Sequence, residues 1–377
     1  MQVWIRQGMA YRPKSDRPTP FPVPGWMWDP SLGQSLYDQR IRYMRRIDEL
    51  GFDGLIFTEH HYGPNGGLTP SPNLMMAAAS QVTERVKLIT MGIILALHGH
   101  PVRVAEELAM VDNLSHGRVV AGFISGNAEA HYAYNMPGAE GRARHREAFD
   151  LLRRAWTEEN PFEWHGEFFD YDCVSILPRP VQRPHPEVWT ASGSAESIEF
   201  SASRHINLVA SGPIQQVRET LAYYQRYAQD ECSWTPTSAN LGMSREFFMA
   251  PHMDEVRDVV ENVILRDRAD AYDPAFEIPA LHELEKGKYT ERSYDFLSAA
   301  RSGRDRRGGR SLEDICERGI YIVGDPDAVT EQIIHQHDEL GTEVLVIRPE
   351  MGHLSLDQSL EMLELFAREV LPVVQKL

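Results

Sequence analysis

A glutamate and two histidines, Glu59, His60 and His61, stand together at the end of an apolar run that is typical of a buried strand. Histidine titrates near neutral pH, so a histidine pair beside a carboxylate indicates proton handling in a reaction. The same side chains, joined by His98 and His100, could instead bind a metal ion. No Asp or Cys motif completes a ligand set, so we favour acid–base chemistry and predict no metal site.

A turn of small residues, Ser192-Gly193-Ser194, follows a second apolar run and precedes a helical segment. Small residues let backbone N–H groups approach a phosphate, and a helix N-terminus attracts negative charge. Ordinary helix capping by either serine would explain the same pattern. The chain has no GxGxxG, Walker or GxSxG motif, so dinucleotide-binding, NTPase and hydrolase functions lack their sequence signatures.

These residues lie in a chain that alternates short β-type runs with amphipathic segments. We predict strands at 2–5, 52–60, 86–97, 118–125, 187–192, 207–211, 245–250 and 343–349. We predict helices at 36–50, 73–85, 102–114, 142–157, 195–203, 215–228, 327–340 and 356–370. The alternation of strands and helices predicts that the strands pair in parallel. The count of eight strands favours a closed (β/α)8 TIM barrel over an open doubly wound sheet.

The rhythm is interrupted after the seventh strand. We predict that residues 1–377 form a single domain with a long insertion between strands 7 and 8, at about 251–317. Long inserts on barrel loops after strands lie at the catalytic face, so this segment is interpreted as a lid, with a surface insertion as the alternative. Residues at the C-terminal ends of barrel strands face the active site. The residues at such positions include Glu59-His60-His61, Ser192-Gly193-Ser194 and Met91-Gly92.

The 377-residue chain has a formal net charge of −17, which disfavours partners such as nucleic acid and anionic membrane surfaces. No run of about 18 apolar residues predicts a membrane span, and the N-terminus lacks the apolar core of a signal peptide. The three cysteines, far apart, predict no disulfide framework. Together these features predict a cytoplasmic protein.

Three segments together resemble bacterial luciferase-like monooxygenases: ELGFDGLIFTEHHY, LTPSPNLMMAAAS and LITMGIILALHGHPVRVAEELAMVDNLSHGRVVAGF. The later segments WTASGSAESIEFSA and GDPDAVTEQI are also similar, so the resemblance covers about 35–250 and 318–370. It implies a TIM barrel, often a homodimer, that uses reduced FMN (FMNH2) from a separate NAD(P)H:flavin reductase. O2 would add to the flavin as a C4a-(hydro)peroxyflavin, which oxidises an aldehyde, a ketone or another small organic substrate.

The resemblance also assigns roles to residues. His60 takes the place of the catalytic histidine, ahead of His61 and Glu59. Met91 and Gly92 would lie against the isoalloxazine ring, where several members hold a cis peptide. The remaining cofactor contacts that it implies are Asn127, Tyr132, Ser192, Gly193 and Ser194.

Two departures from the family pattern limit what is implied. Luciferase has a cysteine where this chain has Ile124 or Ser125, so light emission is not inferred. An arginine that serves the phosphate in luciferase is missing from the same loop, so another group or the backbone must neutralise it.

Two alternatives use the same barrel. One is a deazaflavin (F420) oxidoreductase that transfers hydride, but its oligoglutamate tail needs basic residues near the mouth, and an acidic chain offers few. The other is a non-catalytic flavin-binding homologue, against which Glu59, His60 and His61 argue.

Overall fold

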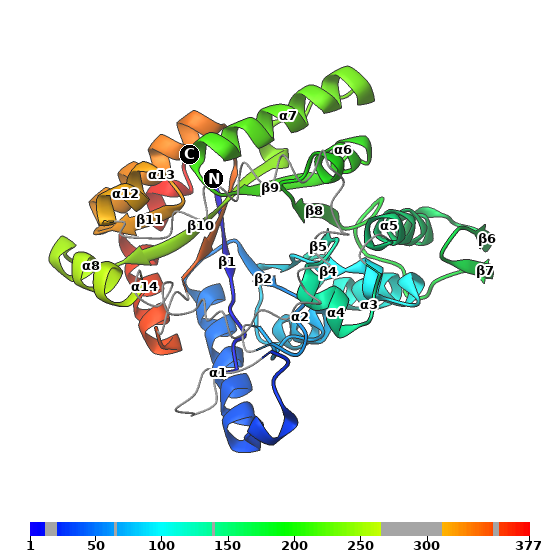
Figure 1. The fold of residues 1–377 in the computed structure, drawn as a ribbon, viewed down its shortest axis with the longest axis horizontal. Coiled ribbons are helices and arrows are strands. Elements are labelled where there is room, and N and C mark those ends of the chain that lie inside the picture. Colours follow the sequence, from blue (N-terminus) through cyan, green and yellow to red (C-terminus); the bar gives the residue numbers. More distant parts are fainter. Residues whose placement is uncertain (12–20, 64–65, 138–139, 265–310, 350–353) are drawn as a thin grey trace.

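The computed structural model describes residues 1–11, 21–63, 66–137, 140–264, 311–349 and 354–377. Its centre is a closed ring of eight parallel strands (Figure 1). In ring order they are β1 (Gln2–Arg6), β2 (Gly54–Phe57), β3 (Lys87–Thr90), β5 (Val119–Ile124), β8 (Glu187–Ala191), β9 (Asn207–Ser211), β10 (Leu241–Met249) and β12 (Val344–Arg348). β12 pairs with both β10 and β1, which closes the ring and confirms the predicted (β/α)8 TIM barrel.

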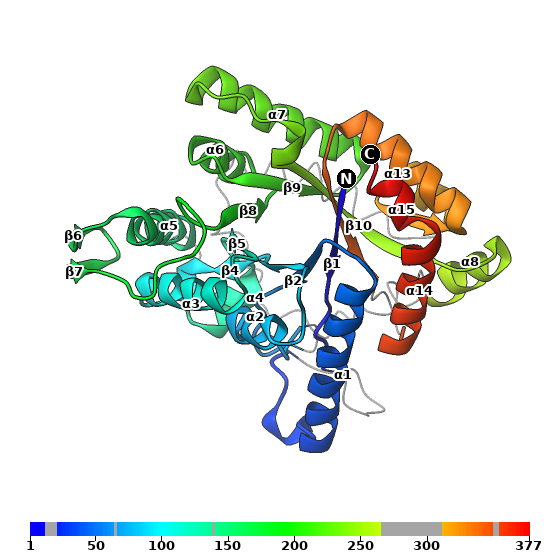
Figure 2. The same ribbon diagram turned by 180° about the vertical axis from the view of Figure 1, so that it is seen from behind.

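Helices cover the outside of this ring (Figure 2). The principal ones are α1 (Pro30–Glu49), α2 (Pro72–Ser80), α3 (Pro101–Leu114), α5 (Gly141–Thr157), α6 (Ala195–Ser203), α7 (Ile214–Cys232), α13 (Pro326–Leu340) and α14 (Leu356–Glu369). The shorter ones are α4 (Ala128–Ala133), α8 (Met253–Val259), α12 (Leu312–Glu317) and α15 (Leu371–Val374). Within the described ranges, none of the helices combines the length and apolarity that crossing a bilayer requires.

The helix starts follow local capping chemistry. α1 begins at Pro30, earlier than the predicted residue 36, because the Asp29 carboxylate accepts hydrogen bonds from the first-turn N–H groups of Ser31 and Leu32. Proline fits the first helical position, where its missing N–H costs nothing. Asp325 caps α13 in the same way.

The predicted strand at 86–97 is shorter in the structure. β3 ends at Thr90, and after the Met91-Gly92 peptide, which is cis, the chain forms the two-residue β4 (Ile93–Ile94) and a 3-10 turn. The Thr90 hydroxyl oxygen accepts a hydrogen bond from Gly122 N at 2.7 Å, where a backbone ladder bond would otherwise form. A Cβ atom on Gly122 would lie 1.8 Å from Thr90 O, so only glycine allows this approach.

Two strand features were not predicted. The aromatic excursion at 158–186 contains the antiparallel hairpin of β6 (Phe162–His165) and β7 (Asp170–Val174). Before α13, β11 (Tyr321–Gly324) pairs in parallel with the C-terminal half of β10. Of the predicted 251–317 lid, the structure shows α8, the following π turn and α12, whereas 265–310 lie outside the described residues.

Apolar side chains from alternate strand positions fill the inside of the barrel. Trp4 and Trp189 meet edge to face with their ring centroids 5.0 Å apart. Gly54 makes room for Trp4, because a Cβ atom there would lie 2.8 Å from the indole. The rest of this inner cluster consists of Ile56, Ile89, Val120, Val209, Val344 and Val346. The barrel is therefore packed solid below the point where the cavity opens.

Candidate active site

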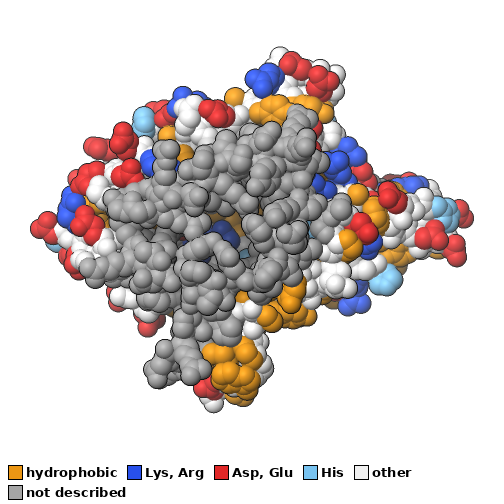
Figure 3. All heavy atoms as spheres, in the orientation of Figure 1, with side chains coloured by type: hydrophobic (Ala, Val, Ile, Leu, Met, Phe, Trp, Pro, Cys, Tyr) orange, Lys and Arg blue, Asp and Glu red, His pale blue; other side chains and the backbone are white. Residues whose placement is uncertain are grey.

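A cavity of about 620 Å³ opens where the barrel strands end. Its volume lies in the usual range of about 300–1,000 Å³ for ligand pockets. Residues from β1, β2, β5, β8, β9, β10 and β12 contribute to its wall, so the strand-end positions predicted from the sequence do meet in space. In Figure 3, blue Lys or Arg atoms are visible near the centre of the face shown.

The wall of this cavity is rich in arginine although the chain as a whole is acidic. Its described lining includes two carboxylates, Glu59 and Glu246. The arginines that line it are Arg6, Arg142, Arg245, Arg318 and Arg348. The expectation that an acidic chain offers few basic groups to a cofactor was therefore wrong, because net charge does not report where individual charges lie.

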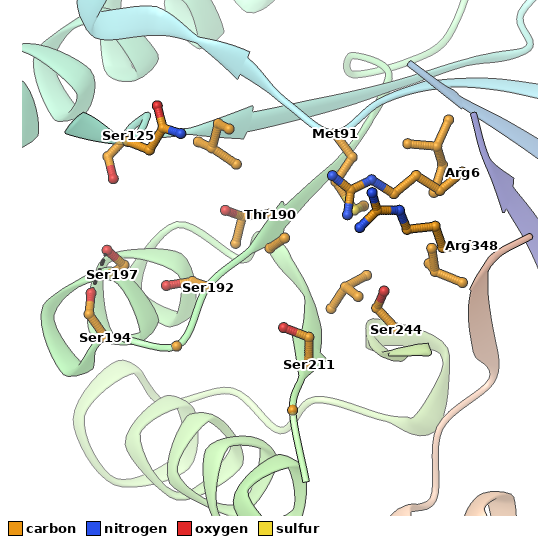
Figure 4. Close-up of a pocket in the computed structure, with 18 of the residues that line it drawn as sticks. Arg6, Met91, Ser125, Thr190, Ser192, Ser194, Ser197, Ser211, Ser244 and Arg348 are labelled. Atoms are coloured by element: carbon orange, nitrogen blue, oxygen red, sulfur yellow. Dashed lines mark hydrogen bonds between the residues drawn. The ribbon is translucent and has the colours of Figure 1, made fainter. Parts of the chain in front are cut away.

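At one end of the cavity the N-terminus of α6 faces inward. Ser194 occupies the N-cap position, but no side chain caps the first turn, since its hydroxyl donates to the Ser197 hydroxyl at 2.9 Å. A Cβ atom on Gly193 would meet nothing within 4 Å, so this turn borders open space. Figure 4 shows Ser192, Ser194 and Ser197 grouped at this end. The turn therefore leaves backbone N–H groups and the positive end of α6 available to an anion.

Arg142 supplies a positive charge at the same end, from the first turn of α5. Its Nη1 atom lies 3.3 Å from the Glu196 carboxylate of α6. The sequence alone did not indicate which group takes the place of the arginine missing from the loop after β5. The start of the predicted helix at 142 was the available signal, because the helix that follows a barrel strand begins on the side where that strand ends.

At the other end, Arg6 and Arg348 point into the cavity beside Met91 (Figure 4). β1 and β12 pair Ile5 with Ile347, which brings the two arginines that follow onto neighbouring strands. Glu246 is the register partner of Arg348, and its carboxylate lies 3.4 Å from the Arg348 guanidinium.

The Glu59 side chain is 3% exposed, and both of its carboxylate oxygens have partners. One carboxylate oxygen accepts a hydrogen bond from Ile94 N at 2.8 Å and lies 3.5 Å from His98 Nε2, and the other lies 2.8 Å from His61 Nε2. Burial alone would raise the pKa of Glu59, but the hydrogen bonds from His61, His98 and Ile94 lower it below its ordinary value. Glu59 is therefore a carboxylate that positions its neighbours.

His60 and His61 occupy opposite environments although they are adjacent in sequence. His61 is buried, with Nε2 on Glu59 and Nδ1 3.4 Å from the Tyr134 hydroxyl. His60 lines the cavity, and its ring packs against Gly66, where a Cβ atom would lie 2.5 Å from the imidazole. Burial and the positive charge of Arg6 lower the pKa of His60 to about 4, so its ring is neutral at physiological pH.

Residues 26–343 match the family model described as luciferase-like monooxygenase.

The chain belongs to the luciferase-like monooxygenase family.

Named relatives and a solved structure agree with this assignment. Over 183 residues the chain is 30% identical to the oxygenase component of flavin-dependent trigonelline monooxygenase from Acinetobacter baylyi, covering 48% of this chain and 50% of that protein. Over 363 residues it is 27% identical to F420-dependent glucose-6-phosphate dehydrogenase from Intrasporangium calvum, covering 92% and 97%. The crystal structure of monooxygenase RslO1 from Streptomyces bottropensis matches with a TM-score of 0.74 at 26% identity, covering 99% of each chain. The chain spans about half the length of the trigonelline monooxygenase component and of other curated relatives that it matches.

Most of the positions that the luciferase-like resemblance assigned lie in the cavity wall. Glu59, His60, Met91, Asn127 and the whole Ser192–Ser194 turn line it. The Asn127 carboxamide also caps α4, because its oxygen accepts a hydrogen bond from Ala130 N at 2.9 Å. Gly92 packs beneath the wall, where a Cβ atom would lie 2.9 Å from Ile124.

Besides Gly92, two assigned residues, Tyr132 and His61, do not line the cavity. Tyr132 lies on α4 with 39% of its surface exposed, and its ring faces Phe21 at 6.3 Å. The short α4 turns this side chain outward, which the sequence did not reveal. His61 is separated from the cavity because its imidazole is directed to Glu59 and Tyr134.

The low pKa of His60 can be tested by NMR titration of the imidazole, assigned with the His60→Gln variant. We expect a pKa of about 4 in the folded protein. An unfolded histidine titrates at about 6.5, so as the pH falls from there to about 4 the unfolded chain takes up a proton that the folded chain does not. The contribution of His60 to stability therefore decreases through this window.

Arg348→Met should raise the pKa of His60, because the positive charge of Arg348 is one of the effects that lower it. Arg103→Met, which removes an exposed arginine on α3, is the control and should leave the titration unchanged. Titration of wild-type His60 near its ordinary value would contradict the described environment.

Proposed function

We propose that this protein is an FMNH2-dependent monooxygenase that uses O2 to oxidise a small organic substrate, with a separate NAD(P)H:flavin reductase supplying the reduced flavin. The observation that carries the proposal is that the two ends of one cavity differ in the groups they offer to a ligand. The uncapped N-terminus of α6 and Arg142 lie at one end, whereas Met91 and His60 lie at the other end together with Arg6 and Arg348 (Figure 4).

The α6 end suits the phosphate of FMN. A phosphate carries up to two negative charges, and the uncapped first turn of α6 offers backbone N–H groups together with the positive end of the helix. Arg142, which also pairs with Glu196, adds a guanidinium from α5, and Ser192 and Ser197 also line this end. These groups would fix the phosphate and leave the ring to extend along the cavity.

The Met91 end suits the isoalloxazine ring. When bound, reduced FMN supplies the electrons and activates dioxygen. The residues of this chain would orient the ring against Met91 and present the neutral imidazole of His60 to the substrate side. A neutral imidazole can accept a proton from a substrate or donate a hydrogen bond, whereas Glu59 and His61 would act by holding the strand end that carries it.

An F420-dependent hydride transfer is the second candidate. Five arginines in the cavity wall would accommodate an anionic tail, and the relative from Intrasporangium calvum is named as F420-dependent. We rank FMN first because one phosphate accounts for the α6 end without a further anionic tail.

The phosphate assignment predicts how one substitution affects two flavins. Arg142→Met should weaken FMN binding about 10- to 100-fold, since a hydrogen bond to a charged group contributes about 1.5–3 kcal/mol. Riboflavin, which lacks the phosphate, should bind the variant and the wild type equally. Fluorescence titrations with FMN, riboflavin and F420 measure these affinities.

The control is Arg153→Met, further along α5 and outside the cavity wall. An equal loss of FMN and riboflavin affinity in Arg142→Met would refute the phosphate position. Binding of F420 that is much tighter than binding of FMN would favour the second candidate.

The oxygenase assignment predicts transfer of an oxygen atom and different effects of the two histidines. With FMN, a flavin reductase and NADH under 18O2, a screen of aldehydes, ketones and carboxylates should yield a product labelled in one oxygen. His60→Ala should lower the rate of labelling about 10²- to 10⁴-fold at an unchanged Tm, as expected for a general acid–base residue. His61→Ala should lower the Tm, because it removes a partner of the buried Glu59 carboxylate.

Mass spectrometry of the products and thermal denaturation separate these outcomes. Unlabelled products across the screen, or undiminished labelling by His60→Ala, would argue against the oxygenase or against the role of His60, respectively.

A further inference from the structure

A second cavity of about 570 Å³ lies beside the first. It is bounded by the segment that follows β1, by α1 and by the start of α14. Arg6, His60 and Arg348 line both cavities. These three side chains therefore stand at the boundary between the proposed flavin site and a separate space large enough for a small molecule.

The second cavity combines a cationic end with an apolar surface. Its apolar lining includes Leu32 and Leu36 from α1 and Leu356 from α14. Its charged residues are Arg6, Arg40 and Arg348, and none of the described residues that line it is acidic. Such a wall favours an amphiphilic anion over a neutral or cationic molecule.

Gln7 supplies independent evidence for a ligand. The residue is 2% exposed and is one of those that line this cavity. Neither Nε2 nor Oε1 of its carboxamide has a hydrogen-bond partner among the residues that the structure describes. A buried amide without partners destabilises a fold, so a ligand group that accepts its N–H would relieve this cost.

The charged groups at the boundary between the two cavities leave about one positive charge for a ligand to balance. The Arg348 guanidinium already faces the Glu246 carboxylate at 3.4 Å. Arg6 forms no ion pair with any described residue. Burial and the nearby Arg348 lower its pKa to about 10, and the more distant Glu246 carboxylate offsets only part of this effect. A bound monoanion would compensate this buried charge, whereas a phosphate dianion would bring more negative charge than the Arg6 side leaves unbalanced.

We propose that the second cavity binds the organic substrate, and that this substrate is a small carboxylate with an apolar body. Its carboxylate contacts Arg6, Arg348 and the Gln7 amide, and its apolar part lies along the leucines of α1 and α14. Bound in this way, it reaches His60 from the side opposite the flavin. The assignment rests on the proposed function, because it takes the first cavity as the flavin site.

The test uses FMN-loaded protein and two pairs of probes with matched shapes: benzoate with benzamide, and hexanoate with hexanamide. Isothermal titration should show that at least one carboxylate binds tenfold or more tightly than its amide. Phenyl phosphate should bind no more tightly than benzoate. Arg6→Met should reduce carboxylate affinity tenfold or more, because it removes a buried charge that pairs with the ligand.

Gln7→Leu provides the sharper test, because Gln7 lines the second cavity only. It should weaken carboxylate binding about tenfold, leave FMN affinity unchanged and leave the Tm equal or higher, since it removes an amide without partners. A residue that merely supported the fold would instead lower the Tm. Gln34→Leu, at an exposed position of α1, is the matched control and should alter neither affinity.

The failures of the two proposals differ. Absence of FMN binding by the wild type would contradict the proposed function. With FMN bound, equal affinities for the carboxylate and its amide, or carboxylate binding unaltered by Gln7→Leu, would overturn the substrate assignment. The same holds if Arg6→Met weakens binding of reduced FMN but not of the carboxylates, since the arginine would then serve the flavin ring.

Discussion

The buried carboxylate of Glu59 is the interaction on which the site depends. A carboxylate removed from water must be matched by donors, and Glu59 obtains them from Ile94 N, His61 and His98. These contacts tie the end of β2 to β4 and to the turn before α3. Because His61 is drawn to Glu59, its neighbour His60 is left facing the cavity. One buried charge thus divides two adjacent histidines between a positioning role and a place in the cavity wall.

Charge is distributed unevenly in this molecule. A chain of net charge −17 directs five arginines to one cavity. Low-dielectric walls strengthen the field of such groups, so the cavity attracts anions that the outer surface repels. Burial disfavours protonation of His60, and the positive charges of Arg6 and Arg348 add to this effect, so its pKa lies near 4. The proposed flavin phosphate, the proposed carboxylate substrate and the neutral histidine are consequences of one electrostatic arrangement.

Periodicity and turn chemistry were sufficient to predict the barrel, because each strand and helix carries its own pattern of apolar residues. α6 and β9 have the predicted bounds, and the Ser192–Ser194 turn lies in the cavity wall. What escaped prediction depends on contacts between distant segments. Arg6 and Arg348 become neighbours only when β1 pairs with β12 to close the ring. Gln7 is buried by packing between segments, which no local sequence pattern predicts. β11 was missed because four apolar residues are too short a signal beside a long insertion.

The central claim is that one cavity holds a flavin with its phosphate at α6 and its ring at Met91. The most direct measurement is a crystal structure of the protein with FMN. The account predicts phosphate density within hydrogen-bond reach of the Ser192–Ser194 turn and of Arg142, with the ring between Met91 and His60. Phosphate density beside Arg6 and Arg348, with the ring directed toward α6, would contradict it.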